Sequence, residues 1–187
     1  MTSSTTPPRR HFLRQASRLA AATAPLAMLG PPAARARGAG ERSLSLVHTH
    51  TSERLSIVYA IENLYPEPAL AALNRFLRDH YTGQVGSMDP QLFELLHRTR
   101  QLLGTDAAFE IISGFRGQDT NERLRRTGGG GVATRSLHTE GRAVDVRLPG
   151  VPLAELRDAA LSLKAGGVGY YPAERFVHLD TGRVRRW

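Results

Sequence analysis

Apolar and polar positions along the chain alternate in patterns that predict both strands and amphipathic helices. Residues 44–47 and 54–59 are β-rich runs separated by a polar segment, which predicts a hairpin. Apolar residues at helical spacing predict three helices, and a fourth, polar helix is expected between two short apolar runs. The expected helices cover residues 68–80, 90–103, 119–126 and 152–164, and the further strands cover 107–112, 143–148, 169–171 and 176–179. This order predicts an α+β fold with a small, mostly antiparallel sheet packed by helices.

The first 36 residues have the pattern of an export signal. A basic start is followed by an uncharged run of 16 residues, 19–34, which contains prolines and is shorter than the roughly 20 residues that a membrane span requires. Ala34-Arg35-Ala36 offers a small-residue cleavage site, so the mature domain would cover residues 37–187. Arg9-Arg10-His11-Phe12-Leu13 resembles the twin-arginine signal, which implies export to the periplasm. The alternative is a disordered basic tail.

Charge and cysteine content exclude several classes of protein. The chain has no cysteine, which excludes disulfides, thiolate metal sites and a cysteine nucleophile. The formal charge is +8, but residues 1–36 hold five arginines and no acid, and the remaining 20 basic and 17 acidic residues leave +3. A nucleic-acid-binding protein is therefore a minor alternative, and we expect no nucleic-acid partner.

Two histidines lie in segments where strand alternation predicts the direction of nearby side chains. In the segment Ser136-Leu137-His138-Thr139-Glu140-Gly141-Arg142-Ala143-Val144-Asp145, Asp145 is expected on the face opposite the apolar valines. In residues 175–180, His178 and Asp180 share the face opposite Val177 and Leu179. If the two strands pair, His138, Asp145 and His178 converge. Two imidazoles and one carboxylate suit zinc with a fourth position open, although a hydrogen-bonded His–Asp pair is the simpler alternative. His48 and His50 form a weaker metal candidate.

The pattern S-x-H-x-x-G-x-A-x-D, followed by a late H-x-D, resembles the M15 family of zinc peptidases, the D-alanyl-D-alanine peptidase group. Residues 113–116, 148–153 and 166–178 also resemble its exported murein endopeptidase branch. The resemblance implies a hedgehog/D-Ala-D-Ala peptidase fold and one zinc ion held by His138, Asp145 and His178. It further implies that Arg116 holds a substrate carboxylate or polarises a carbonyl, and we assign Ser136 with Arg116 to substrate binding.

The chain departs from the family pattern at the catalytic base. Many M15 enzymes carry Glu or Asp three residues before the last zinc histidine, where this chain has Arg175. Glu174 is one residue out of step and would face away on a strand. We therefore favour Asp180, which shares a strand face with His178, either as the base or as the group that orients His178.

The combined interpretation is a periplasmic, zinc-dependent murein endopeptidase that acts on the peptide stems of peptidoglycan, without a membrane span and as a monomer. One alternative is a D-alanyl carboxypeptidase of the same fold. The other is a non-catalytic, zinc-containing murein-binding domain, which the missing acid at position 175 favours.

Overall fold

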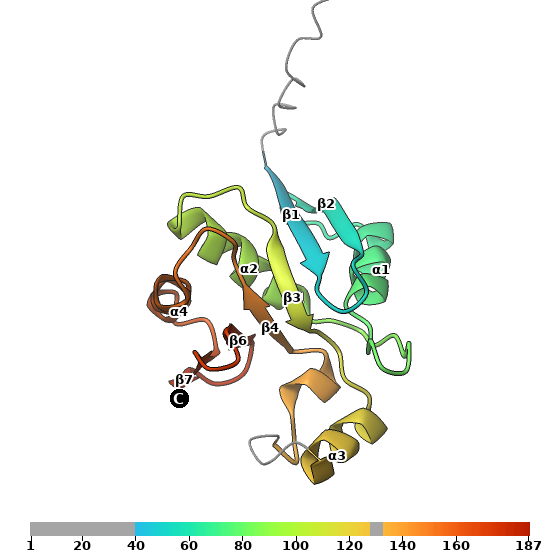
Figure 1. The fold of residues 1–187 in the computed structure, drawn as a ribbon. Coiled ribbons are helices and arrows are strands. Elements are labelled where there is room, and N and C mark those ends of the chain that lie inside the picture. Colours follow the sequence, from blue (N-terminus) through green and yellow to red (C-terminus); the bar gives the residue numbers. More distant parts are fainter. Residues whose placement is uncertain (1–39, 128–132) are drawn as a thin grey trace, which may run out of the picture. The chain divides into compact units, whose positions relative to one another are not determined.

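The computed structural model describes residues 40–127 and 133–187, and the export signal predicted over residues 1–36 lies outside them, as does the whole glycine run at 128–131. The described residues form strands, four α-helices and one 3-10 helix (Figure 1). The strands are β1 (Glu41–His48), β2 (Arg54–Ile61), β3 (Phe109–Ser113), β4 (Ala143–Arg147), β5 (Gly167–Tyr171), β6 (Phe176–Asp180) and β7 (Arg185–Arg186). The helices are α1 (Glu67–Phe76), α2 (Pro90–Leu102), α3 (Gln118–Thr127), η1 (Leu137–Glu140) and α4 (Leu153–Ser162).

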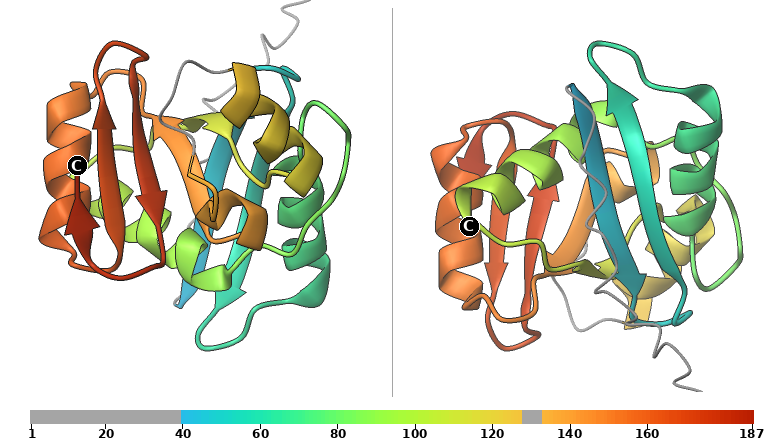
Figure 2. Two further views of the ribbon diagram at one scale, coloured as in Figure 1. Left: turned by 90° about the horizontal axis from the view of Figure 1, so that it is seen from below. Right: turned by 90° about the horizontal axis from the view of Figure 1, so that it is seen from above.

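One mixed sheet contains all the strands of the described part, in the order β2-β1-β3-β4-β6-β5-β7 (Figure 2). Four of its six neighbouring pairs are antiparallel, and the pairs β1–β3 and β5–β7 are parallel. The predicted α+β class is confirmed. The predicted sheet is only partly right, because seven strands and two parallel pairs make it larger and more mixed than expected.

A single apolar core joins α1, α2 and α4 to the sheet. Helix residues such as Leu73, Phe93 and Leu156 share this core with strand residues such as Val146 and Leu179, all fully buried. The alternation predicted for β4 and β6 therefore holds: their valines and Leu179 pack on the core, and the opposite face is left for polar side chains.

Helix α1 ends at Phe76 rather than at His80, because the following backbone is engaged elsewhere. The carbonyl of Leu77 accepts a hydrogen bond from Phe115 N at 2.7 Å. The Asp79 carboxylate accepts hydrogen bonds from Tyr81 N and Gly117 N, both at 2.9 Å. These bonds hold the chain in a turn beside the segment that leaves β3.

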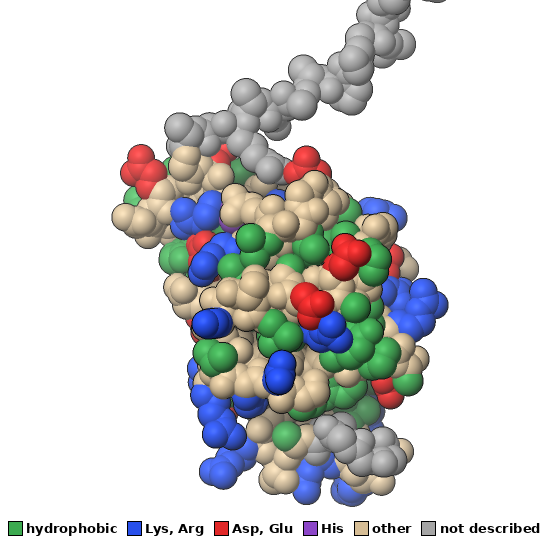
Figure 3. Space-filling model, turned by 90° about the vertical axis from the view of Figure 1, so that its left-hand side faces the viewer, with side chains coloured by type: hydrophobic (Ala, Val, Ile, Leu, Met, Phe, Trp, Pro, Cys, Tyr) green, Lys and Arg blue, Asp and Glu red, His purple; other side chains and the backbone are tan. Residues whose placement is uncertain are grey.

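None of the described helices is long and apolar enough to cross a membrane. Figure 3 shows the face that carries α4 and β7, where Lys and Arg side chains are interspersed with apolar and other polar groups. On this face the basic residues do not form one continuous patch.

Candidate metal centre

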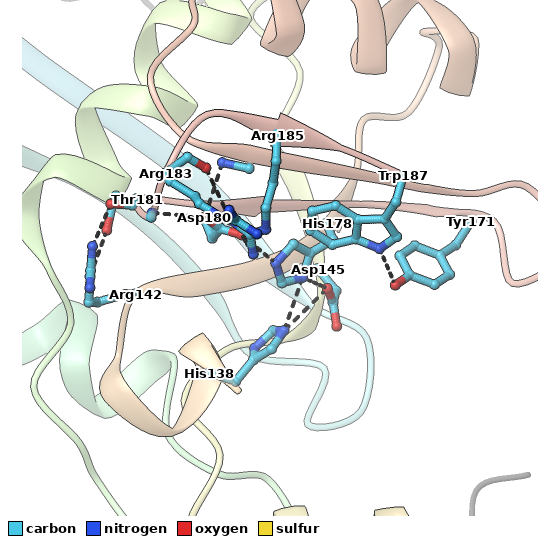
Figure 4. Close-up of polar contacts among 12 residues, drawn as sticks. His138, Arg142, Asp145, Tyr171, His178, Asp180, Thr181, Arg183, Arg185 and Trp187 are labelled. Atoms are coloured by element: carbon cyan, nitrogen blue, oxygen red, sulfur yellow. Dashed lines mark hydrogen bonds and ion pairs between the residues drawn. The ribbon is translucent and has the colours of Figure 1, made fainter. Parts of the chain in front are cut away.

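Adjacent strands bring two of the predicted ligands together. In the antiparallel β4–β6 pair, Asp145 lies directly opposite His178. His138 comes from η1, which is capped at its C-terminal end by Gly141 with φ of 68°. A Cβ at Gly141 would lie 1.9 Å from the carbonyl oxygen of Ser87, so only glycine allows η1 to turn into β4 at this point. The turn places His138 beside the strand pair (Figure 4).

The three side chains, which we call the triad, point one atom each at a common centre. His138 Nε2 lies 3.3 Å from both His178 Nδ1 and Asp145 Oδ1, and His178 Nδ1 lies 2.8 Å from Asp145 Oδ1. Tetrahedral ligands at about 2.1 Å from a zinc ion would be roughly 3.4 Å apart. Within residues 40–127 and 133–187, the triad is the group of three or more potential ligand residues whose ligand atoms all lie within 4.8 Å of one another.

Both imidazoles are held so that an inner nitrogen is available to a metal. His138 Nδ1 donates to the carbonyl of Gly114 at 2.7 Å, which leaves Nε2 as the inner atom. His178 Nε2 donates to the Asp180 carboxylate at 3.1 Å, which leaves Nδ1 as the inner atom. An imidazole that binds metal through one nitrogen commonly donates its other N–H to a carbonyl or carboxylate, so these residues fit a metal centre.

Burial and charge set the protonation of the triad. Burial alone would raise the pKa of Asp145, but the interaction with His138 and hydrogen bonds from both histidines hold that pKa well below its usual range. Burial alone would lower the pKa of His178, but hydrogen bonds to Asp145 and Asp180 outweigh it and raise the pKa to about 9. Asp145 is therefore an anion, and a metal ion at the triad would replace the protons that the inner nitrogens share with it.

Asp180 lies behind His178, on the side away from the triad (Figure 4). Its side chain is fully buried, and its two oxygens accept hydrogen bonds from Gly167 N, Gly182 N and both terminal nitrogens of Arg185, besides His178. Burial opposes ionisation, but these bonds hold the pKa of Asp180 below its usual range. Asp180 is not among the residues that line the cavity, so its placement suits the orientation of His178 better than contact with a substrate.

A cavity of about 420 Å³ opens at the triad. Arg116 and Ser136, the two predicted substrate-binding residues, both line it. An Arg116 guanidinium nitrogen lies 3.9 Å from Asp145 Oδ2, and the same side chain donates to Ser113 and Asn121 at 3.4 Å. Arg116 is thus held at the edge of the triad with part of its guanidinium facing the cavity.

Glu174 also lines the cavity, contrary to the expectation that it faces away. That expectation placed it on a strand, whereas it lies in the turn between β5 and β6, next to Arg175 with φ of 62°. Side-chain alternation does not apply to such a turn. Asp145 and Glu174 are the acids of this cavity lining.

Several residues at the site were missed from the sequence. Tyr171, Phe176, Arg185 and Trp187 line the cavity together with Arg135. A signal for this close approach was available at Gly169, since a glycine inside a strand often marks a place where other groups approach closely. The other metal candidate, His48 with His50, is not part of the triad: His48 Nδ1 accepts a hydrogen bond from His50 N at 3.2 Å, and the His50 ring stacks on His80 with 4.1 Å between ring centroids.

The chain is similar in sequence to known peptidoglycan peptidases. The family model Peptidase_M15_2, described as peptidoglycan L,D-endopeptidase MepK, matches residues 36–187. Peptidoglycan L,D-endopeptidase MepK of Escherichia coli strain K12 is 45% identical over 146 residues, which is 78% of this chain and 80% of the relative. The protein of that name from Shigella flexneri gives the same values. Probable peptidoglycan L,D-endopeptidase MepK of Haemophilus influenzae is 42% identical over 147 residues, 78% of each chain.

Proposed function

The chain belongs to the M15_2 family of peptidoglycan L,D-endopeptidases, and we infer that it is a peptidase that hydrolyses L,D peptide bonds in peptidoglycan. This agrees with the murein endopeptidase predicted from the sequence. A peptidoglycan endopeptidase acts in the cell envelope.

The triad fits one zinc ion, held by His138, Asp145 and His178. The observation that carries this proposal is the orientation of both imidazoles, each with its outer N–H held by an acceptor and its inner nitrogen 3.3 Å or less from Asp145 Oδ1. When bound, zinc would act as a Lewis acid on a carbonyl and make water a nucleophile near neutral pH.

Arg116 would orient the substrate at the metal centre. Its guanidinium is anchored by Ser113 and Asn121 and faces the cavity next to Asp145. A planar guanidinium can donate two parallel hydrogen bonds to a carboxylate, or one to the oxygen of the scissile carbonyl as negative charge develops there. Ser136, buried at the start of η1 and on the cavity wall, would contribute a hydroxyl to the same region.

Two different acids would divide the roles that the sequence assigned to Asp180. Asp180, buried and bonded on both oxygens, would hold the His178 ring and its tautomer. Glu174, on the cavity wall, would take the proton from the attacking water and deliver it to the leaving amine. The position of Glu174 supports this role, because Glu174 is the acidic residue of the cavity lining that does not belong to the triad.

The test is digestion of purified muropeptides by the purified chain, followed by chromatography and mass analysis. We expect products cut at an L,D bond, and loss of activity after chelation that added zinc restores. Release of terminal D-alanine alone would favour the carboxypeptidase alternative. Binding of zinc and muropeptide without any cleavage would favour the non-catalytic alternative.

Export would follow the twin-arginine route to the periplasm, as residues 9–13 suggest. We expect one chain to suffice for activity, because the triad and the cavity lining come from a single copy.

A further inference from the structure

Three aromatic side chains form one wall of the cavity. Tyr171 and Phe176 stack with 4.6 Å between ring centroids, and the Trp187 indole N–H donates to the Tyr171 hydroxyl at 2.7 Å. The Trp187 ring lies 5.3 Å from the ring of His178 (Figure 4). These three residues, which we call the aromatic wall, therefore extend directly from one of the triad residues.

The sheet holds Trp187 in this position. Its carbonyl accepts a hydrogen bond from Tyr170 N at 3.0 Å, and the Arg185 guanidinium lies 4.8 Å above its ring. Gly169 lies beneath the wall and pairs with His178 across β5 and β6. A Cβ at Gly169 would lie 2.7 Å from the indole and 2.8 Å from the Tyr171 ring, so only glycine lets both rings lie flat here.

The wall offers a hydrocarbon surface to whatever enters the cavity. The polar atoms of Trp187 and Tyr171 bond to each other, and Trp187 remains 49% exposed. The cavity lining also includes Arg116 and Ser136. An occupant that contacts both the aromatic wall and Arg116 has a hydrocarbon segment for the wall and a carboxylate or carbonyl for the guanidinium. A peptide residue with a long aliphatic side chain has both.

We propose that the aromatic wall is the subsite for a long aliphatic side chain on a residue that flanks the scissile L,D bond. This rests on the proposed endopeptidase function, since a bond placed at the triad puts a flanking side chain within reach of Trp187. Trp187 is then a specificity-determining residue, because it contacts the part of the substrate that does not react. A contact made equally before and during the reaction lowers KM and leaves kcat nearly unchanged.

The test uses synthetic peptides that share one L,D bond and differ in a flanking residue, which is either norleucine or alanine, placed on the carbonyl or on the amine side. The wild-type chain should prefer norleucine on one side by roughly 10–100-fold in kcat/KM, since single methylenes are discriminated by about tenfold or more in apolar pockets. In Trp187→Ala this preference should fall roughly tenfold or more, mainly through KM, while the zinc content stays at the wild-type level. Trp187→Phe should keep most of the norleucine preference. The matched control is Leu102→Ala, at an exposed apolar residue at the end of α2, and it should keep the full preference.

Two further measurements keep the proposal testable if Trp187→Ala folds poorly. Gly169→Ala displaces the wall without removing it, and should reduce the norleucine preference in the same direction. Trp187 is the single tryptophan of the chain, so its emission reports occupancy of the subsite. The norleucine peptide should shift the emission of chelator-treated protein at a roughly tenfold lower concentration than the alanine peptide.

The possible failures are distinguishable. A wild-type chain that cleaves neither peptide and no muropeptide contradicts the proposed function itself. A wild-type chain that cleaves both peptides without preference overturns the subsite alone. An unchanged norleucine preference in Trp187→Ala also overturns the subsite. A tryptophan emission that neither peptide shifts has the same consequence.

Discussion

Replacement of Asp180 by Asn tests how His178 is held ready for a metal ion. In the wild-type chain one Asp180 oxygen faces His178 Nε2 and Arg185, and the other faces Gly167 N, Gly182 N and Arg185. If the Asn oxygen keeps the two backbone N–H groups, its NH2 group faces His178 Nε2. That nitrogen must then accept, so it gives up its proton, and His178 keeps a proton on Nδ1, the atom that points at Asp145. The opposite amide orientation is less favourable, because it places the NH2 group against the N–H groups of Gly167 and Gly182, and all of these groups are donors.

The size of the effect follows from these contacts. Loss of an outer partner of a metal-binding histidine typically weakens metal affinity by ~10–100-fold. Each factor of ten corresponds to about 1.4 kcal/mol of binding free energy. The metal-free chain should also lose about 2 kcal/mol of unfolding free energy, because Arg185 loses the carboxylate of a buried, charge-assisted hydrogen bond.

The assay is competition for zinc with a chromophoric chelator, combined with turnover at increasing zinc. Asp180→Asn should bind zinc more weakly and regain most of its activity at saturating zinc. Glu174→Gln is the matched comparison and should show the reverse, with wild-type zinc affinity and turnover reduced by roughly 10²–10⁴-fold. Wild-type zinc affinity in Asp180→Asn together with a permanent loss of turnover would refute the reasoning and restore Asp180 as the base.

Three other predictions concern the metal, acid stability and export. We expect one zinc ion per chain, lost on alanine substitution at any triad position while the far-ultraviolet circular dichroism stays close to wild type; near-stoichiometric zinc in His178→Ala, measured by mass spectrometry, would contradict the ligand assignment. Burial first, and then the neighbouring His80 and His50, lower the pKa of His48 to about 4 from its ordinary 6.5. The unfolded chain therefore binds more protons below pH 6.5, and the unfolding free energy should fall by up to about 3 kcal/mol as pH drops from 6.5 to 4. In urea titrations at pH 7 and 4.5, His48→Asn should lose less unfolding free energy on acidification than the wild-type chain. Equal losses in the two proteins would contradict the assignment of this pH dependence to His48. Replacement of Arg9 and Arg10 together by Lys should retain the protein in the cytoplasm, and a periplasmic double variant on cell fractionation would show that another route is used.

Local patterns were sufficient for the parts of the site that lie on regular strands. Val144 and Val146 on one face of β4, and Val177 and Leu179 on one face of β6, fix the opposite direction for Asp145 and His178. Successive side chains of a strand point to opposite faces, so an apolar face directed at the core fixes the direction of the residues between. The convergence of these two residues then needed only the assumption that the strands pair, and in the structure they are direct neighbours.

Features that depend on irregular backbone or on the pairing of distant segments could not be predicted from local sequence patterns. Glu174 sits in a turn, where no periodicity predicts a direction. The strand β7 has two residues, too few for a pattern, so local periodicity did not place Trp187 beside His178. The parallel pairing of β1 with β3 joins segments about 60 residues apart and reflects tertiary packing rather than local preference.

The direct opposition of Asp145 and His178 has a consequence for the lifetime of the protein. A zinc ion held by both residues would join neighbouring strands 33 positions apart in the sequence, and the unfolded chain holds no such arrangement. Binding to the native state alone adds RT ln(1 + [zinc]/Kd) to the unfolding free energy, about 4 kcal/mol when free zinc exceeds Kd a thousandfold. Metal supply and resistance to proteolysis are thereby thermodynamically linked. When zinc is scarce, the metal-free fraction would be both inactive and the first to be degraded, so the amount of enzyme would track the metal available to it.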